Sequence, residues 1–273
     1  MHPRNELEPE PEHEPQPDPE STPPPEPEPD STPEPEPEPT PKPRRRFGCT
    51  RLLLAALALV VLYALFQWIT WPDVEALAAD NPESTAFIER AQRRGVDVDQ
   101  RWVSYGAISP HLKRAVLASE DMSFFDHDGF DDAEIEKALS EAWEEKRLPR
   151  GASTLTQQLA KNLWLTPSYN PWRKVKEAML TRQLEEHLEK RRIFELYLNV
   201  AQFGPDVYGA EAAARRYYGV PASALSEEQA ARLAAGLPRP SSWHPGVQSG
   251  SYDWKTNLVL GRMRKAGWLW KVI

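Results

Sequence analysis

Three polar segments in the middle of the chain carry the side chains best suited to chemistry. They read E-D-M-S-F-F-D-H-D-G-F-D from position 120, G-A-S-T-L-T-Q-Q-L-A-K-N from position 151 and R-K-V-K-E from position 173. The outer two contain glutamates, Glu120 and Glu177, and the middle one contains Lys161. Two carboxylates on either side of a polar, basic stretch suit acid/base chemistry on a substrate with an anionic group, such as a sugar attached to a phosphate.

Glu120 is the candidate general base. Joining two sugars requires removal of a proton from the hydroxyl group that attacks the anomeric carbon of the donor. A carboxylate in a partly desolvated cleft does this well, because desolvation disfavours its charged form. In the alternative interpretation, Glu120 only caps a helix or forms an ion pair and takes no part in the chemistry. Asp121 and Phe124 are also candidate substrate contacts. Support of the loop is the favoured role of Asp121, and Phe124, Phe125 and His127 are expected to hold the loop by packing and hydrogen bonds. No partner at ligand spacing accompanies His127, so no metal site is predicted.

The pattern Thr154-x-x-Gln157 is a capping box, and it predicts a helix that begins directly after Gly151 and Ala152. The start of a helix presents amides and a positive dipole end, which commonly bind phosphate. Six polar side chains on the first turns are candidate substrate contacts: Ser153, Thr154, Gln157, Gln158, Lys161 and Asn162. Taken alone, the same pattern fits an ordinary capped helix.

The third segment combines cations with a glutamate. Arg173 and Glu177 are spaced i,i+4, which by itself fits a surface salt bridge worth a few tenths of a kcal/mol. In a functional interpretation, Arg173, Lys174 and Lys176 stabilise a departing diphosphate, and Glu177 orients them or holds a divalent ion. A diphosphate is already a good leaving group, so no protonating acid is required, in contrast to a glycosidase pair.

These blocks resemble the signature motifs of the family 51 glycosyltransferases, the peptidoglycan glycosyltransferases that polymerise lipid II. Three further blocks follow in the family's order: K-R-R-I-F-E-L-Y-L-N at 190–199, Y-G-A-E-A-A-A-R-R-Y-Y-G at 208–219 and G-L-P-R-P-S-S-W-H-P at 236–245. The resemblance covers roughly residues 100 to 250. It implies that Glu120 is the base, that Lys161 contacts the pyrophosphate and that Glu177 is functionally important.

The resemblance also implies an activity. The growing glycan would be transferred from undecaprenyl diphosphate to the 4-hydroxyl of lipid II, which gives a β-1,4 linkage with inversion. No cofactor is required, although Mg²⁺ or Mn²⁺ is compatible with the chemistry, and the partners would be lipid-linked glycans and cell-wall synthesis proteins, not nucleic acid. No S-x-x-K of the transpeptidase type is found, so a monofunctional enzyme is expected. The alternatives are a lysozyme-like muramidase and a catalytically weak or silent cell-wall scaffold.

One position departs from the family's pattern. The family commonly has an arginine four residues ahead of the R-K pair, and Tyr169 occupies that position here. A phenol donates one hydrogen bond but brings no charge. Either Arg173 or Arg150 compensates, or activity is reduced, and this departure keeps the scaffold alternative open.

The first 46 residues contain 17 of the 28 prolines, mostly alternating with glutamate. Their 13 acidic and 5 basic side chains leave 28 of each sign in the rest of the chain. Such a segment has almost nothing to bury, so residues 1–46 are predicted to be a disordered tail. Residues 47–71 contain the apolar run Leu52–Ile69, which is about long enough to cross a bilayer. Basic residues at 44–46 and 51 precede it, so the positive-inside rule predicts a cytoplasmic N-terminus and an outer domain. The resemblance implies that the membrane is a bacterial inner membrane.

Residues 72–273 are numerous enough for one domain with a core. Apolar periodicity and caps predict helices from Pro110 to Glu120, Ala133 to Lys146, Leu155 to Leu165, Trp172 to Leu198 as one or two, Ala210 to Tyr218, Glu227 to Ala235 and Thr256 to Lys265. A weakly paired strand is expected only at 102–108. The fold class is therefore mainly α, with Asn199 as a buried hydrogen-bonding corner. The resemblance implies a lysozyme-like helical domain with a membrane-facing subdomain, preceded by one transmembrane helix.

Overall fold

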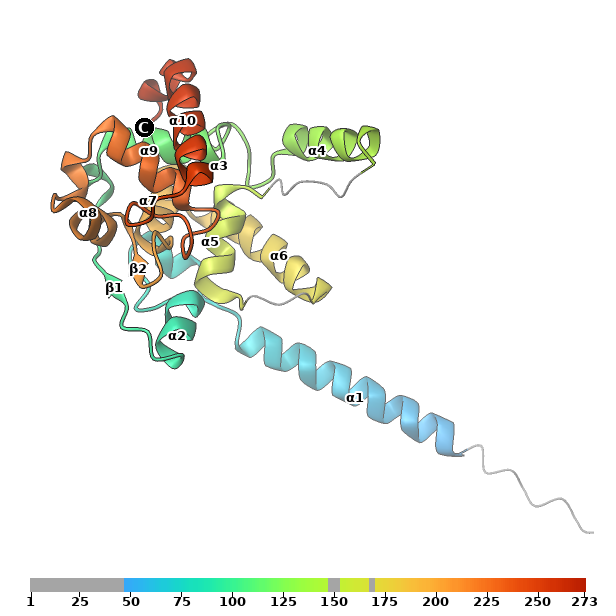
Figure 1. Cartoon of the computed structure of the whole chain (residues 1–273). Helices are drawn as coiled ribbons and strands as arrows, with labels where there is room; N and C mark the ends of the chain where they lie inside the picture. The colour runs from blue at the N-terminus through green and yellow to red at the C-terminus, as the bar shows by residue number, and fades with distance from the viewer. Residues whose placement is uncertain (1–46, 147–152, 167–169) are drawn as a thin grey trace, which may run out of the picture. The chain divides into compact units, whose positions relative to one another are not determined.

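The computed structural model describes residues 47–146, 153–166 and 170–273. Helices account for most of these residues, which confirms the predicted mainly α class (Figure 1). The chain divides into two units, Met1–Tyr63 and Ala64–Ile273. The core and the candidate site lie in the second unit.

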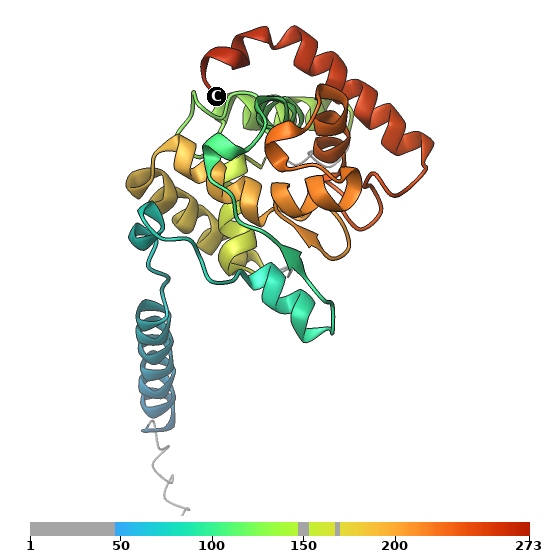
Figure 2. The same cartoon turned by 90° about the vertical axis from the view of Figure 1, so that its left-hand side faces the viewer.

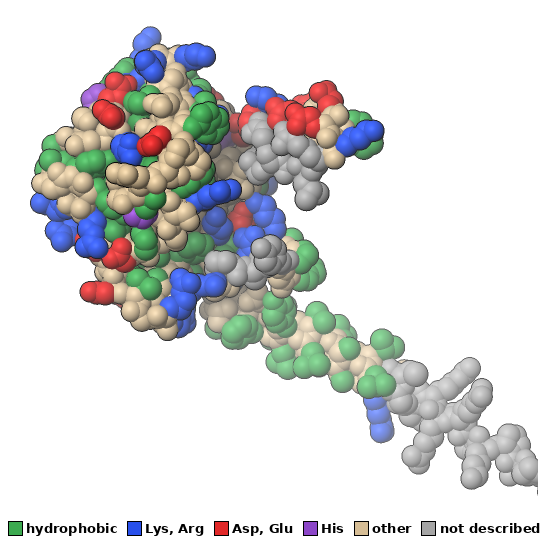
Figure 3. Space-filling model, in the orientation of Figure 1, with side chains coloured by type: hydrophobic (Ala, Val, Ile, Leu, Met, Phe, Trp, Pro, Cys, Tyr) green, Lys and Arg blue, Asp and Glu red, His purple; other side chains and the backbone are tan. Residues whose placement is uncertain are grey.

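Helix α1 (Phe47–Ile69) is apolar on all sides. Its stretch Thr50–Ile69 spans 20 residues, and none of it is buried within the structure. Hydrophobic side chains cover this helix in Figure 3. Since about 20 apolar residues are needed to cross a bilayer, α1 is the membrane-span candidate of the described residues, as the sequence predicted.

Helix α3 (Pro110–Glu120) positions the first glutamate. The Ser109 hydroxyl accepts a hydrogen bond from the His111 amide at 3.2 Å, and Pro110 occupies the first turn, so the predicted start is correct. The middle of α3 is buried against α9 (Glu227–Gly236) and α10 (Gly250–Lys265), which lie beside it in Figure 1. Figure 2 shows the same helices from the side. Helix α10 begins six residues before the predicted Thr256.

A second group of helices packs together: α5 (Leu155–Trp164), α6 (Pro171–His187) and α7 (Lys190–Val200). The segment predicted as one or two helices between 172 and 198 is therefore two. Leu188 separates them in an extended conformation, with its side chain buried. Glu189, which follows it, is also extended, so these two residues end one helix and begin the next.

The remaining elements are shorter. They are α2 (Ala86–Arg93), α4 (Asp132–Glu144), α8 (Ala210–Tyr218), the parallel strands β1 (Asp99–Gln100) and β2 (Val207–Tyr208), and four 3₁₀ turns (Glu75–Ala78, Tyr105–Ala107, Ala222–Ala224, Gly267–Lys271). The strand predicted at 102–108 is wrong. That segment contains the 3₁₀ turn Tyr105–Ala107, and the residues that pair as a strand, Asp99–Gln100, lie just before it. Helix α2 was not predicted; its short apolar face buries only Ile88 and Ala91.

Asn199 at the end of α7 is the predicted hydrogen-bonding corner, and its side chain is fully buried. Its amide accepts from the Val103 amide and donates to the Val103 carbonyl, both at 2.9 Å. Gly209 lies against it with φ +84°, and a Cβ there would be 2.6 Å from the Asn199 carbonyl oxygen. Only glycine suits both this backbone angle and this close approach. The corner holds α7 to the segment that leads into α3.

Candidate active site

Glu120 is the last residue of α3 and lines a cavity of about 660 Å³. Its carboxylate is held at both oxygens: Oε1 accepts from the Ser119 hydroxyl at 3.0 Å, and Oε2 accepts from Nε2 of Gln158 at 3.2 Å. The side chain is half-buried, so one side of it faces the cavity. This arrangement suits a base, because an ionised, oriented carboxylate can accept a proton from a hydroxyl group bound in the cavity.

Helix α10 brings two cations into the same cavity, Lys255 and Arg262. The guanidinium of Arg262 donates to the carbonyls of Ala118 and Ser119 at 3.3 and 3.4 Å, at the end of α3. Burial lowers the pKa of Lys255, and the charge of Glu120 opposes this effect. Sequence reasoning missed both residues, because the recognised motifs end near residue 245. Their spacing of two helical turns was the available signal.

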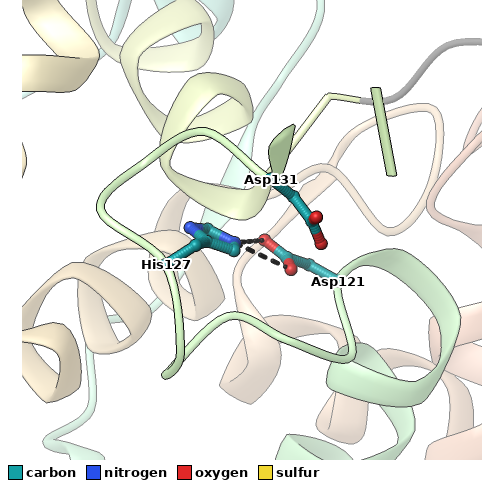
Figure 4. A group of neighbouring side chains, drawn as sticks. All are labelled: Asp121, His127 and Asp131. Carbon is teal, nitrogen blue, oxygen red and sulfur yellow. Dashed lines mark hydrogen bonds and ion pairs between the residues drawn. The ribbon is translucent and has the colours of Figure 1, made fainter. Parts of the chain in front are cut away.

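Asp121 joins the loop after α3 to the start of α5. Its buried carboxylate accepts from the Leu155 amide at 2.9 Å and from Nε2 of His127 at 3.1 Å (Figure 4). Thr154 strengthens the same junction, since its hydroxyl donates to the Gly129 carbonyl at 2.7 Å. These contacts give Asp121 the supporting role expected for it.

Asp121, His127 and Asp131 form a group whose potential ligand atoms lie within 4.8 Å of one another. The hydrogen bonds argue against a metal there. The Gly129 amide donates to Nδ1 of His127 at 3.1 Å, so the imidazole proton resides on Nε2 and points at Asp121. A metal on Nε2 would normally leave a proton on Nδ1, where the amide already points. Asp131 is also engaged, because the Ser123 hydroxyl donates to it and lowers its pKa.

The start of α5 differs from the prediction. The capping box is present, with the Gln157 amide donating to the Thr154 hydroxyl at 3.3 Å and the Thr154 amide donating to Oε1 of Gln157 at 3.1 Å. Together with the Leu155 amide on Asp121, three amides are satisfied by the protein's own side chains. The prediction that these amides are exposed to a phosphate is therefore wrong. Gln157 is buried in its capping role, which removes it as a substrate contact.

Lys161 lies one turn beyond Gln158 on the same face of α5, next to Asn162, which is half-buried. Burial lowers the pKa of Lys161, and among nearby charges Glu177 raises it most, with a smaller contribution from Glu120. The ammonium is thus within electrostatic reach of both glutamates. The ammonium lies 6.0 Å from the centroid of the Phe87 ring of α2.

Glu177 on α6 is buried and paired with two cations. Oε2 accepts from Arg173 at 2.7 Å, and Oε1 accepts from Lys174. Lys and Arg side chains gather beside acidic ones around α5 and α6 in Figure 3. Lys176 is placed differently, because its ammonium lies 5.3 Å from the centre of the Trp71 ring. The structure therefore brings two of the three predicted cations to Glu177.

The other predicted contacts fall into three groups. Ser153 is exposed and lines the cavity beside Glu120. Phe124 is fully buried, with its ring centroid 5.6 Å from that of Phe194, so its assignment as a substrate contact is wrong and it supports the loop instead. Tyr169 and Arg150 lie outside the described residues.

Residues 87–264 match the family model described as "Transglycosylase". The match spans more than half of the chain and includes all the helices that build the cavity. The chain belongs to this family.

Several curated relatives carry the name "Biosynthetic peptidoglycan transglycosylase". The protein of Nitrosospira multiformis is 47% identical over 192 residues, covering 68% of this chain and 84% of the relative. That of Laribacter hongkongensis is 44% identical over 212 residues, covering 76% and 93%. That of Methylobacillus flagellatus is 45% identical over 223 residues, covering 78% and 95%.

Proposed function

We propose that this protein is a monofunctional peptidoglycan glycosyltransferase that polymerises lipid II into glycan strands. The observation that carries the proposal is the position of Lys161 within reach of both Glu120 and Glu177. A base, an ammonium and a paired cation cluster are thus close enough to influence one another electrostatically, which one substrate site requires. The family membership and the names of the relatives support the same reaction.

In the proposed reaction, Glu120 removes the proton from the 4-hydroxyl of the acceptor lipid II. The acceptor oxygen bonds to the anomeric carbon of the donor as the bond from that carbon to the diphosphate breaks, with inversion. Lys161 and Arg173 stabilise the negative charge that develops on the departing undecaprenyl diphosphate, because fixed cations act strongly in a partly dry site. Glu177 orients Arg173 and Lys174.

The cavity beside Glu120 fits the acceptor side of this reaction. Lys255 and Arg262 supply cations there, and the acceptor lipid II carries its own diphosphate. We therefore assign the α10 side of Glu120 to the acceptor and the α5–α6 side to the donor. No resident metal is proposed at Glu177, because each of its carboxylate oxygens is already in an ion pair.

We also propose the orientation predicted from the sequence. Helix α1 would cross the bacterial inner membrane once, with the N-terminus in the cytoplasm, because arginines at 44–46 and 51 precede the span. The catalytic domain then meets lipid-linked substrates on the outer face. Other cell-wall synthesis proteins are its expected partners.

The test is polymerisation of labelled lipid II by the purified full-length protein in detergent, analysed on a gel. Wild type should form long glycan strands. Glu120→Gln keeps the shape but removes the proton acceptor, so turnover should fall by roughly 10² or more. Thermal melting should show that both proteins are folded.

Three results would contradict the proposal or the role of Glu120 in it. Release of short sugar fragments from preformed glycan would indicate the muramidase. A folded wild-type protein that neither polymerises lipid II nor cleaves glycan would indicate the scaffold. Normal polymerisation by Glu120→Gln would show that Glu120 is not the base.

A further inference from the structure

The carboxylate of Glu120 is connected to a buried phenol through one side chain. The Tyr197 hydroxyl of α7 donates to Oε1 of Gln158 at 3.0 Å, and Nε2 of Gln158 donates to Oε2 of Glu120 at 3.2 Å. The second hydrogen of the same amide points at the Ser153 carbonyl, 3.5 Å away. Tyr197 is 1% exposed, so it has no contact with solvent.

The chemistry of the three groups determines the direction of the two hydrogen bonds, from Tyr197 to Gln158 and from Gln158 to Glu120. An ionised carboxylate only accepts hydrogen bonds, so Glu120 requires the NH₂ end of Gln158. The two ends of a glutamine amide differ little in shape, and a neighbouring donor decides which end points where. Tyr197 is that donor. Burial raises the pKa of Tyr197 well above its usual value, and Glu120 and Asp121 add to the effect, so the phenol remains protonated.

We propose that Tyr197 is a positioning residue for catalysis, which fixes the amide of Gln158 so that its NH₂ group orients the general base Glu120. The proposal rests on the proposed function of Glu120. Without the phenol, the amide can turn its oxygen toward the carboxylate, which repels the ionised form and misdirects the oxygen that accepts the proton.

The first variant is Tyr197→Phe, which removes only the hydroxyl group. Turnover of lipid II should fall about tenfold, the effect of losing one well-placed hydrogen bond, with little change in KM. The matched control is Tyr252→Phe. Tyr252 is also fully buried, but its hydroxyl donates to the Arg232 carbonyl at 2.6 Å, away from Glu120. The control should retain turnover within about twofold.

A double-mutant cycle separates positioning from packing. Gln158→Met removes the amide and keeps a similar shape, so Tyr197→Phe should cause no further loss in that background. Additive losses, or normal turnover of Tyr197→Phe alone, would overturn the proposal.

The pH profile is a readout that packing alone does not move. Loss of the NH₂ donor disfavours ionised Glu120, so the acidic limb of kcat/KM should move to higher pH in Tyr197→Phe and in Gln158→Met. The other ionisable groups around Glu120 are unchanged in both variants: Asp121, Asp131, Glu134, Lys137, Lys161, Lys255 and Arg262. An acidic limb at the wild-type pH in both variants would overturn the proposal.

Gln158→Glu keeps the test decisive if Tyr197→Phe does not fold. One oxygen of the new carboxylate still accepts a hydrogen bond from Tyr197. The other oxygen takes the place of the NH₂ group of Gln158, so an acceptor faces Glu120 where a donor was. Turnover should be lower than in Gln158→Met, because like charges then meet. Wild-type turnover in Gln158→Glu would overturn the role of the donor. If every variant and the wild type lack polymerising activity, the proposed function fails instead, which is a different result.

Discussion

Both glutamates of the site are held by partners that limit what their carboxylates can do. Glu120 accepts from Ser119 and Gln158, and Glu177 accepts from Arg173 and Lys174. In contrast, the ammonium of Lys161 forms no ion pair or hydrogen bond within the described residues. A cation with nearby charges but no bonded partner is well placed to bind a diphosphate, so the donor assignment rests most directly on this residue.

The pKa of Lys161 predicts a pH dependence. Burial lowers this pKa from its usual value of 10.5, so the ammonium loses its proton at lower pH than an ordinary lysine does. If its charge binds the donor, kcat/KM should fall on the alkaline side. Lys161→Arg stays charged throughout, so the alkaline limb should move to higher pH. The measurement is lipid II consumption between about pH 7 and 10.5.

Lys265→Arg is the control, because Lys265 is exposed and does not line the cavity, so this variant should leave the alkaline limb where it is in the wild type. Lys255→Arg tests the acceptor side, since burial also lowers the pKa of Lys255. If Lys255→Arg moves the alkaline limb and Lys161→Arg does not, the limb reports a group on the acceptor side. That result would contradict the role given to Lys161.

At the scale of elements, the site exists because the end of α3 meets the start of α5. Asp121 makes this junction by accepting from the Leu155 amide and from His127. A second junction is made by Glu185 of α6. Its carboxylate accepts from the Thr156 hydroxyl at 2.5 Å and from Lys190 at 2.9 Å, which joins α5, α6 and α7. The helices that carry the two glutamates, α3 and α6, are therefore linked through the start of α5.

Asp121→Ala tests this junction. It leaves the buried Leu155 amide and His127 without an acceptor, at about 1–3 kcal/mol for each buried donor. The melting temperature should fall by roughly 5 to 15 °C. Asp97→Ala is the control, because Asp97 is exposed and should change little. Equal melting temperatures for the two variants would show that the junction does not stabilise the domain.

At the scale of the whole molecule, the acidic tail, the apolar helix and the catalytic domain have different compositions and different tasks. The tail accounts for the net charge of −8, and the rest of the chain is balanced. Helix α1 has apolar residues on every side, whereas the helices of the second unit bury one face. A tethered domain fits an enzyme with lipid-linked substrates.

Deletion of residues 1–43 should leave polymerisation by the detergent-solubilised protein within about twofold, because a Pro/Glu segment has little to bury or to position a substrate with. The measurement is the rate of lipid II polymerisation beside full-length protein at equal concentration. A tenfold loss would show that the tail contributes to the reaction.

The sequence by itself determined the features that depend on near neighbours. The caps at Ser109 and Thr154 and the ion pair of Arg173 with Glu177 join residues two to four positions apart. Such contacts follow from helical geometry, so local residue types are enough to predict them.

Only the tertiary structure decided the contacts between distant segments. Gln158 and Tyr197 are 39 positions apart, and Arg262 is 144 positions from the Ala118 carbonyl that it contacts. Packing also reversed one local expectation, because Asp121 took the Leu155 amide that was predicted to face a phosphate. Whether a polar group meets a substrate or another part of the protein depends on which helices pack beside it, and no near-neighbour pattern contains that information.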